Sequence, residues 1–167
     1  MPTTSVFTVL GAGGFIGHAL VNWLRERGYD VVTPERQLTP AELSACLTGH
    51  VLYCIGLTAD FRSRPWETID AHIGVLRQLL ANANFSSLTY LSSTRVYEGS
   101  ELGHEDATIC VRPTDANQLF NLSKLMGESL CHRAHHHDRP VRVVRLSNVL
   151  GNDHGSDNFF YALLREA

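Results

Sequence analysis

The sequence predicts an α/β fold in which a mainly parallel sheet is doubly wound, with helices on both faces. Apolar, strand-like runs alternate along the chain with longer stretches whose apolar residues recur with the period of a helix. The strand-like runs are rich in Val, Leu, Ile and Tyr and lack strict alternation, which is typical of strands covered on both faces. A length of 167 residues favours a single domain, residues 1–167.

Five strands are predicted, and each is followed by a helix. The expected strands are Val6–Leu10, Asp30–Thr33, Val51–Leu57, Leu88–Ser92 and Val141–Leu146. The expected helices are Phe15–Arg27, Pro40–Leu47, Trp66–Asn82, Asn117–His135 and Phe159–Glu166. Residues 99–113 carry Gly, Pro, Asp and Thr without periodicity, which predicts a surface loop before the fourth helix.

Composition excludes several classes of partner. Fourteen basic and seventeen acidic residues give a net charge of -3, and no segment concentrates Lys and Arg as a nucleic-acid groove would. No run of eighteen apolar residues and no secretory leader is found, so we expect no membrane partner and a cytoplasmic protein. The four cysteines lack CxxC spacing, which favours free thiols in a reducing compartment.

Three consecutive histidines, 135–137, are the only low-complexity tract. They lie at the predicted end of an exposed helix, close to Cys131 and His132. Because no pattern of supporting carboxylates accompanies them, we expect a solvated helix end and no metal site.

The run GAGGFIG, from Gly11 to Gly17, joins the first strand to the first helix. Glycine at Gly11, Gly13, Gly14 and Gly17 permits a tight turn and lets a diphosphate approach the backbone, and the helix N-terminus at Phe15 and Ile16 supplies partial positive charge. Glycines also serve ordinary turns, but this position between strand and amphipathic helix predicts a Rossmann-type dinucleotide site.

A second element of such a site is an acidic side chain after the second strand. Glu35 follows Gly17 by eighteen residues, close to the expected interval of about twenty, and can accept hydrogen bonds from the adenosine ribose. This favours NAD as the cofactor. The neighbouring Arg36 can instead pair with a 2′-phosphate, which keeps NADP open, and both residues can also be plain loop charges.

Four motifs in order resemble those of the extended short-chain dehydrogenase/reductases, the NAD-dependent epimerase/dehydratase group that acts mostly on nucleotide sugars. They are GAGGFIG, TYLSSTRVYEG (residues 89–99), FNLSKLMGE (residues 120–128) and the run RVVRLSNVLG (residues 142–151). Together they cover almost the whole chain, and four ordered motifs are more specific than any one of them.

The resemblance assigns roles to residues of the second and third motifs. Ser93 occupies the place of the serine or threonine that hydrogen-bonds the reacting oxygen, and Lys124 that of the lysine that binds the nicotinamide ribose. The family's proton-carrying tyrosine stands four residues before that lysine, where this chain has Phe120. Because a phenyl ring carries no titratable proton, tyrosine-based hydride chemistry should be badly impaired. Lys124 with a lowered pKa, or Tyr97, is then the alternative proton carrier, while a ribose-binding lysine and a packing tyrosine are the plainer interpretation.

The chain also departs from the family elsewhere. His72 stands where the family has an asparagine, and a cap on local backbone is favoured over a proton relay. Residues 36–41 are too few for the family's outermost strand, so the sheet should lack one edge strand. The family's C-terminal substrate lobe would follow the last strand, but the sequence ends at Ala167, as a fragment or a short protein would; without that lobe Asn148 stands alone at the substrate side.

Two functions of different classes follow, besides a third hypothesis of a plain Rossmann-type module whose loop binds nothing. The first is an NAD(P)-dependent epimerase, dehydratase or reductase of a nucleotide sugar or similar hydroxylated small molecule, with Ser93 and Lys124 as catalytic candidates. The second is a dinucleotide-binding sensor or partner subunit without turnover. The resemblance also implies a homodimer, paired through the helices around residues 66–82 and 117–135.

Overall fold

A computed structural model describes residues 5–57 and 59–151 of the chain. In this part of the chain a five-stranded parallel sheet has the order β2-β1-β3-β4-β5. Its strands are β1 (Val6–Leu10), β2 (Asp30–Val32), β3 (His50–Tyr53), β4 (Ser87–Ser93) and β5 (Val141–Leu146). The predicted parallel α/β sheet is therefore confirmed. The order reverses at β1, which places a crevice at the carboxyl ends of β1 and β3.

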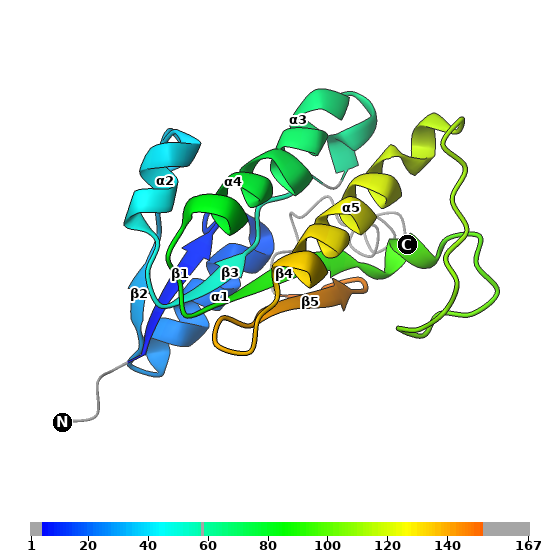
Figure 1. Cartoon of the computed structure of the whole chain (residues 1–167). Helices are drawn as coiled ribbons and strands as arrows, with labels where there is room; N and C mark the ends of the chain where they lie inside the picture. Colours follow the sequence, from blue (N-terminus) through cyan, green and yellow to red (C-terminus); the bar gives the residue numbers. More distant parts are fainter. Residues whose placement is uncertain (1–4, 58, 152–167) are drawn as a thin grey trace.

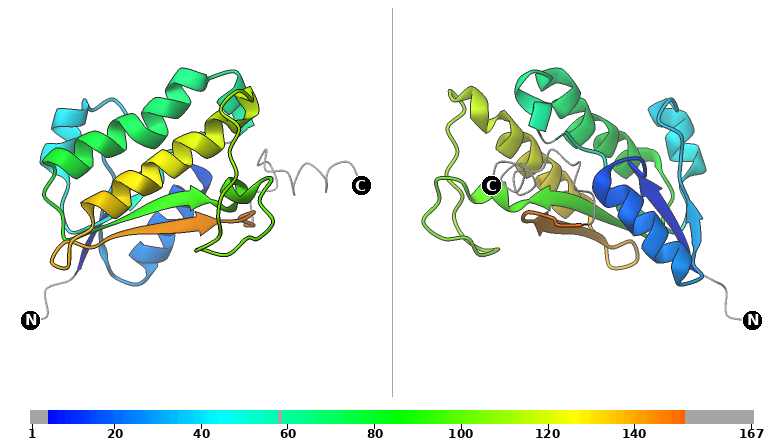
Figure 2. Two further views of the ribbon diagram at one scale, coloured as in Figure 1. Left: turned by 45° about the vertical axis from the view of Figure 1, so that its right-hand side comes forward. Right: turned by 180° about the vertical axis from the view of Figure 1, so that it is seen from behind.

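Helices lie on both faces of the sheet, as predicted (Figures 1 and 2). One face carries α2, α4 and α5, and the other carries α1. The α-helices are α1 (Phe15–Glu26), α2 (Pro40–Cys46), α3 (Pro65–Ile69), α4 (Val75–Asn82) and α5 (Leu119–Ala134). Short 3-10 turns are η1 (Ala59–Arg62), η3 (Thr94–Tyr97) and η4 (Ala116–Gln118), and η2 (Asp70–Gly74) is a π turn. None of the described helices is both long enough and apolar enough to cross a bilayer.

The main core lies between the sheet and α2, α4 and α5. Its buried side chains include Leu10, Val51, Tyr53, Leu76, Leu79, Leu88, Tyr90 and Cys131. A smaller cluster under α1 contains Val9, Val21 and Leu24. Coverage is uneven, because Val144 of β5 is 39% exposed, so the prediction that every strand is covered on both faces is wrong for β5 within the described residues.

Two strand predictions ran too long. The third strand was expected to reach Leu57, but β3 ends at Tyr53, and Cys54 makes the last bond to β1 by donating its N–H to the Leu10 carbonyl at 2.9 Å. Beyond Leu10 the neighbouring strand turns into the glycine loop and offers no partner. β2 likewise ends at Val32 instead of Thr33.

The predicted helix 66–82 is helical throughout but not uniform. It runs through α3, then the π turn 70–74, then α4. A π turn leaves carbonyls out of the regular helical pattern, and π turns occur often at functional sites. Here the Tyr53 hydroxyl donates to the Ala71 carbonyl at 2.6 Å, and the Tyr90 hydroxyl donates to the His72 carbonyl at 3.4 Å.

The chain between β2 and α2 is short, and its end is fixed by a capping box. Thr39 Oγ1 accepts from the Glu42 N–H at 3.3 Å, and Glu42 Oε2 accepts from the Thr39 N–H at 2.8 Å. Within the described residues β2 is the edge of the sheet, in agreement with the predicted loss of an outer strand. The helix predicted at 159–166 lies outside the described residues.

Candidate functional site

The glycine loop turns the chain from β1 into α1 at the carboxyl edge of the sheet. Gly11 has a φ of +78°, and an added Cβ there would lie 2.8 Å from the Cys54 carbonyl oxygen. Gly17 is buried in the first turn of α1, where an added Cβ would collide with the Gly11 carbonyl oxygen. These two glycines are therefore required by the packing of the loop itself.

The middle of the same loop is open. Gly13 and Gly14 are exposed, and an added Cβ on Gly13 would meet no atom within 4 Å. Gly14 is the N-cap of α1 and makes no side-chain cap, so the first-turn amides at Phe15 and Ile16 gain no acceptor from it. A cavity of about 780 Å³ extends from Gly13 along the outer side of α1 to Trp23. An uncapped helix N-terminus facing open space fits the diphosphate of a dinucleotide.

Glu35 and Arg36 are exposed in the turn that follows β2. In the ladder between β1 and β2, Thr8 is level with Val32. Glu35 follows the end of β2 at Val32 by three residues, and so lies past the same edge of the sheet at which β1 enters the glycine loop. A carboxylate after the second strand, at this edge of the sheet, is where an adenosine ribose ligand is expected.

Lys124, the only lysine in the chain, lies on the buried face of α5 and is 6% exposed. Its Nζ donates to the Leu91 carbonyl of β4 at 2.8 Å and lies 5.0 Å from the centroid of the Tyr90 ring. Burial lowers the pKa of Lys124 to about 8, although the charge of Glu128 opposes the shift. The amine therefore changes charge close to neutral pH.

Phe120 is packed in an aromatic cluster with Phe61 and His72. Its ring centroid lies 5.3 Å from that of Phe61 and 5.2 Å from that of His72, with the histidine ring edge-on. Phe120 is 5% exposed and Phe61 is 1% exposed. The Arg95 guanidinium lies over both phenyl rings, 4.8 Å from Phe61 and 5.5 Å from Phe120. Sequence reasoning identified Phe120 but missed Phe61, which comes from η1 and closes over it.

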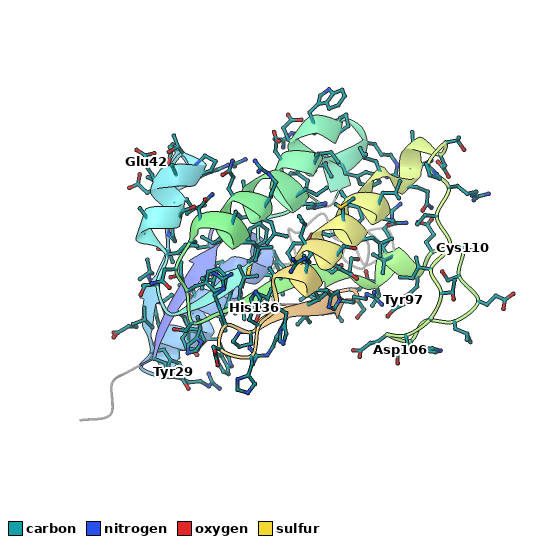
Figure 3. The ribbon with its side chains drawn as sticks, in the orientation of Figure 1. Tyr29, Glu42, Tyr97, Asp106, Cys110 and His136 are labelled. Atoms are coloured by element: carbon teal, nitrogen blue, oxygen red, sulfur yellow. The ribbon has the colours of Figure 1, made fainter. Side chains whose placement is uncertain are left out.

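Ser93 ends β4 and is the N-cap of η3, and Tyr97 is the last residue of η3. Ser93 Oγ accepts from the Arg95 N–H at 3.2 Å and so caps that turn. The Tyr97 hydroxyl accepts from Arg145 Nη1 at 2.7 Å. Figure 3 shows Tyr97 beside the loop that carries Asp106, and both residues line a second cavity of about 640 Å³. Tyr97 is thus held by Arg145.

His72 is fully buried in the π turn. Its Nδ1 lies 2.8 Å from Ser123 Oγ of α5, and Ser123 Oγ in turn donates to the Phe120 carbonyl at 2.9 Å. Burial, and then the charge of Lys124, lower the pKa of His72 to about 3, against an opposite effect of the Leu57 backbone, so the ring is neutral. The π turn also directs the ring toward the Ser123 side chain on the neighbouring helix, a contact that the expected backbone cap did not include.

A buried ion pair beneath the site was not predicted. Arg145 of β5 donates through Nη2 to Glu128 Oε2 at 2.7 Å, and Ser92 Oγ donates to Glu128 Oε1 at 2.5 Å. Hydrogen bonding to Glu128 raises the pKa of Arg145. The sequence did carry a signal, because an arginine inside the apolar run VRVVRL needs a buried partner.

The predicted residues fall into separate groups. Lys124, Phe120 and His72 share one buried cluster, while the glycine loop lines the larger cavity and Asn148 is exposed just beyond β5. Neither cavity described above is lined by Lys124, Phe120 or Ser93.

The histidine run contacts the backbone at the start of β5. His135 Nδ1 accepts from the Val141 N–H at 3.2 Å, and the described residues contain no group of three side chains suited to a metal ion.

Comparisons with known proteins agree with this fold. A short-chain dehydrogenase/reductase superfamily protein from Agrobacterium tumefaciens with bound NAD matches at a TM-score of 0.71 and 22% identity, over 94% of this chain and 54% of that one. The dTDP-4-dehydrorhamnose reductase from Bacillus anthracis, solved with NADP, matches at 0.77 and 18% identity, over 98% and 59%. A mutant of UDP-glucuronic acid 4-epimerase from Bacillus cereus, in complex with a UDP-sugar analogue and NAD, matches at 0.64 and 22%, over 84% and 55%.

The chain thus spans a little over half the length of these proteins. A search of curated protein sequences gives no significant match. A scan of protein families matches residues 7–167 to a single family description. The chain belongs to the NAD dependent epimerase/dehydratase family.

Proposed function

We propose that this protein binds a nicotinamide dinucleotide across the carboxyl edge of β1 and β3. The observation that carries the proposal is the open N-terminus of α1, where Gly13 and Gly14 are exposed and no side chain of the N-cap occupies the amides. The amides of Phe15 and Ile16 would hold the diphosphate, with Gly11 and Gly17 shaping the loop. Solved structures of similar fold hold NAD or NADP, which supports the same class of cofactor here.

Glu35 favours NAD over NADP. An exposed carboxylate just beyond the end of β2 accepts hydrogen bonds from a free 2′-hydroxyl and repels a 2′-phosphate. Arg36, next in the turn, is the group that would accommodate the phosphate, so the ratio of the two affinities measures which side chain dominates.

The activity that the cluster supports best is hydride transfer to or from a hydroxylated substrate, of the nucleotide-sugar type held by the Bacillus cereus protein. A bound nicotinamide supplies the hydride acceptor or donor. Phe120 cannot move the accompanying proton, and Lys124, with a pKa of about 8, is the non-standard carrier that we assign to this step. Ser93 would hold the reacting oxygen by donating its hydroxyl hydrogen, because its Oγ only accepts in the bond from the Arg95 N–H.

A specific observation favours a second candidate, a dinucleotide-binding sensor or partner subunit without turnover. Phe120 is enclosed by Phe61 and His72 instead of facing an open crevice. Such packing suits a site that has lost its proton carrier.

For either function we propose a homodimer that pairs through α3 to α5. Two large apolar side chains on these helices are exposed, Trp66 by 79% and Met126 by 52%.

Replacing Phe120 with tyrosine separates the two candidates. The protein and its F120Y variant are assayed for nicotinamide reduction with NAD and NADP against a panel of sugar nucleotides. A rate of nicotinamide reduction about 100 times or more higher in F120Y than in the unsubstituted protein indicates a binding protein with a decayed active site. Equal activity in both indicates that another group, Lys124 on this proposal, carries the proton. Activity retained in K124M would contradict that assignment.

A further inference from the structure

We infer that residues 159–166 dock along the outer side of α1, in the apolar groove between Leu20, Trp23 and Leu150. The segment lies outside the described residues, and the groove that would receive it lies within them. Docking here goes beyond the proposed function, because it does not depend on whether a dinucleotide binds.

α1 is apolar on two sides. The side toward the sheet buries Val21 and Leu24. A second apolar stripe lines the cavity of about 780 Å³ described above, and its members are Ile16, Ala19, Leu20 and Trp23. Trp23 is 48% exposed. A surface helix needs one apolar stripe to face its core, so a second stripe indicates a second contact.

The chain that follows β5 forms the opposite wall of this groove. Val149, Leu150 and Gly151 line it, and Leu150 is 56% exposed. An added Cβ on Gly151 would lie 2.8 Å from Phe15 Cζ, so the chain passes against the start of α1. The right-hand view of Figure 2 shows α1 in front of the sheet, with no other described helix on this face. An apolar patch of this kind marks an interaction surface.

The next stretch of the chain has the composition that such a groove accepts. The described chain reaches Gly151 inside the groove. Residues 152–158, NDHGSDN, are polar and contain a glycine, which is typical of a linker. Residues 159–164, FFYALL, are consecutively apolar. In the helix predicted there, Phe159 and Leu163 share one face and Phe160 and Leu164 lie beside them, so the segment has an apolar face to bury.

The linker is long enough to place this segment on α1. Seven extended residues span up to about 25 Å, whereas α1 rises by about 12 Å from Phe15 to Trp23. A tether this short also holds the segment at a high effective concentration beside the groove, which favours it over a second copy of the chain. Docked against Leu20 and Trp23, the segment would leave the exposed Gly13 and Gly14 to a diphosphate.

Fluorescence of Trp23 in the full chain tests the docking. The chain has two tryptophans, so W66F leaves Trp23 as the only one, and quenching by acrylamide then reports how well the groove is covered. In this background L163S/L164S removes apolar groups from the segment. A19E places a charge in the groove and leaves the sheet side of α1 intact, because Ala19 is exposed. Each change should raise the quenching and shift the emission to longer wavelength, and combining them should add nothing further.

Two single changes are the matched controls. R165S removes a charge from the same segment, and E26S removes an exposed charge from α1 outside the groove. Both should leave the quenching of Trp23 unchanged.

Chymotrypsin gives an independent measurement on the segment itself. Cleavage after Phe159, Phe160 and Tyr161, followed by mass spectrometry, should be at least about tenfold slower in the unsubstituted protein than in A19E, because cleavage follows the population of the open form. Equal cleavage together with equal quenching in all variants would overturn the inference. Protection that disappears when the unsubstituted protein is diluted would also overturn it, because the cover would then be a second copy and not the tethered segment.

Discussion

Replacing Lys124 with methionine should remove a pH-dependent cost of folding. The amine is 6% exposed, and burial lowers its pKa from 10.5 to about 8. Between these two values the unfolded chain holds a proton that the folded protein has released, so the lysine's contribution to stability rises with pH. Methionine of similar length keeps the packing and carries no proton.

The magnitude follows from the size of the shift. Integrating the difference in bound protons from about pH 7.5 to about pH 9.5 gives a gain of about 2 kcal/mol for the lysine protein relative to K124M. Comparing the two proteins cancels the buried tyrosines and cysteines, whose pKa values are raised and whose contributions fall as pH rises.

Urea unfolding followed by far-ultraviolet circular dichroism at the two pH values measures this difference. R77M, which removes an exposed cation of α4, is the control and should show no such pH dependence. A stability difference between the lysine protein and K124M that is the same at both pH values would refute the reasoning, because it would mean that the amine is hydrated in the folded protein.

Three further outcomes concern the supporting structure. H72Q should lose less stability than the unsubstituted protein as the pH falls. The pKa of buried His72 is about 3 in the folded protein and 6.5 in the unfolded chain, so this residue lowers the free energy of unfolding by about 2 kcal/mol between about pH 7.5 and about pH 5. Equal losses in urea titrations of the two proteins would argue against a buried neutral ring. E128Q should lower the free energy of unfolding by about 2 kcal/mol, because Arg145 loses its buried ion pair. E67Q, which breaks an exposed ion pair, is the control, and an equal loss in both variants would argue against the buried pair. Under reducing conditions G17A should fold poorly while G13A folds normally, since only the first added Cβ collides with backbone; similar melting temperatures would contradict the loop geometry.

The fold could be predicted from the sequence because its signals are local and repeated. The strand-like runs and helical stripes each report their own element, and the short link between β2 and α2 predicted the sheet edge correctly. The end of β3 could not be predicted in the same way. It depends on where the neighbouring strand turns away at Gly11, which is a property of the pair and not of the run from Val51 to Leu57.

The candidate site was predictable where a motif names a residue and not where packing creates a neighbour. Glycine spacing indicated the loop, and the resemblance singled out Lys124 and Phe120 but did not predict that both are buried. Phe61 lies far from Phe120 in sequence, and His72 lies far from Ser123, so only the folded chain brings each pair together. The π turn that aims His72 leaves no mark in a helical pattern that continues on both sides of it.

The central claim is that the open amides at the start of α1 bind a diphosphate. Calorimetric titration of NAD into the protein and into G14A tests it most directly, because an added Cβ at Gly14 meets only the Gly11 carbonyl oxygen at 3.4 Å and leaves the fold intact. We predict saturable binding that G14A weakens at least about tenfold without a change in melting temperature. Absence of NAD binding to the unsubstituted protein, or equal affinity in G14A, would contradict the account.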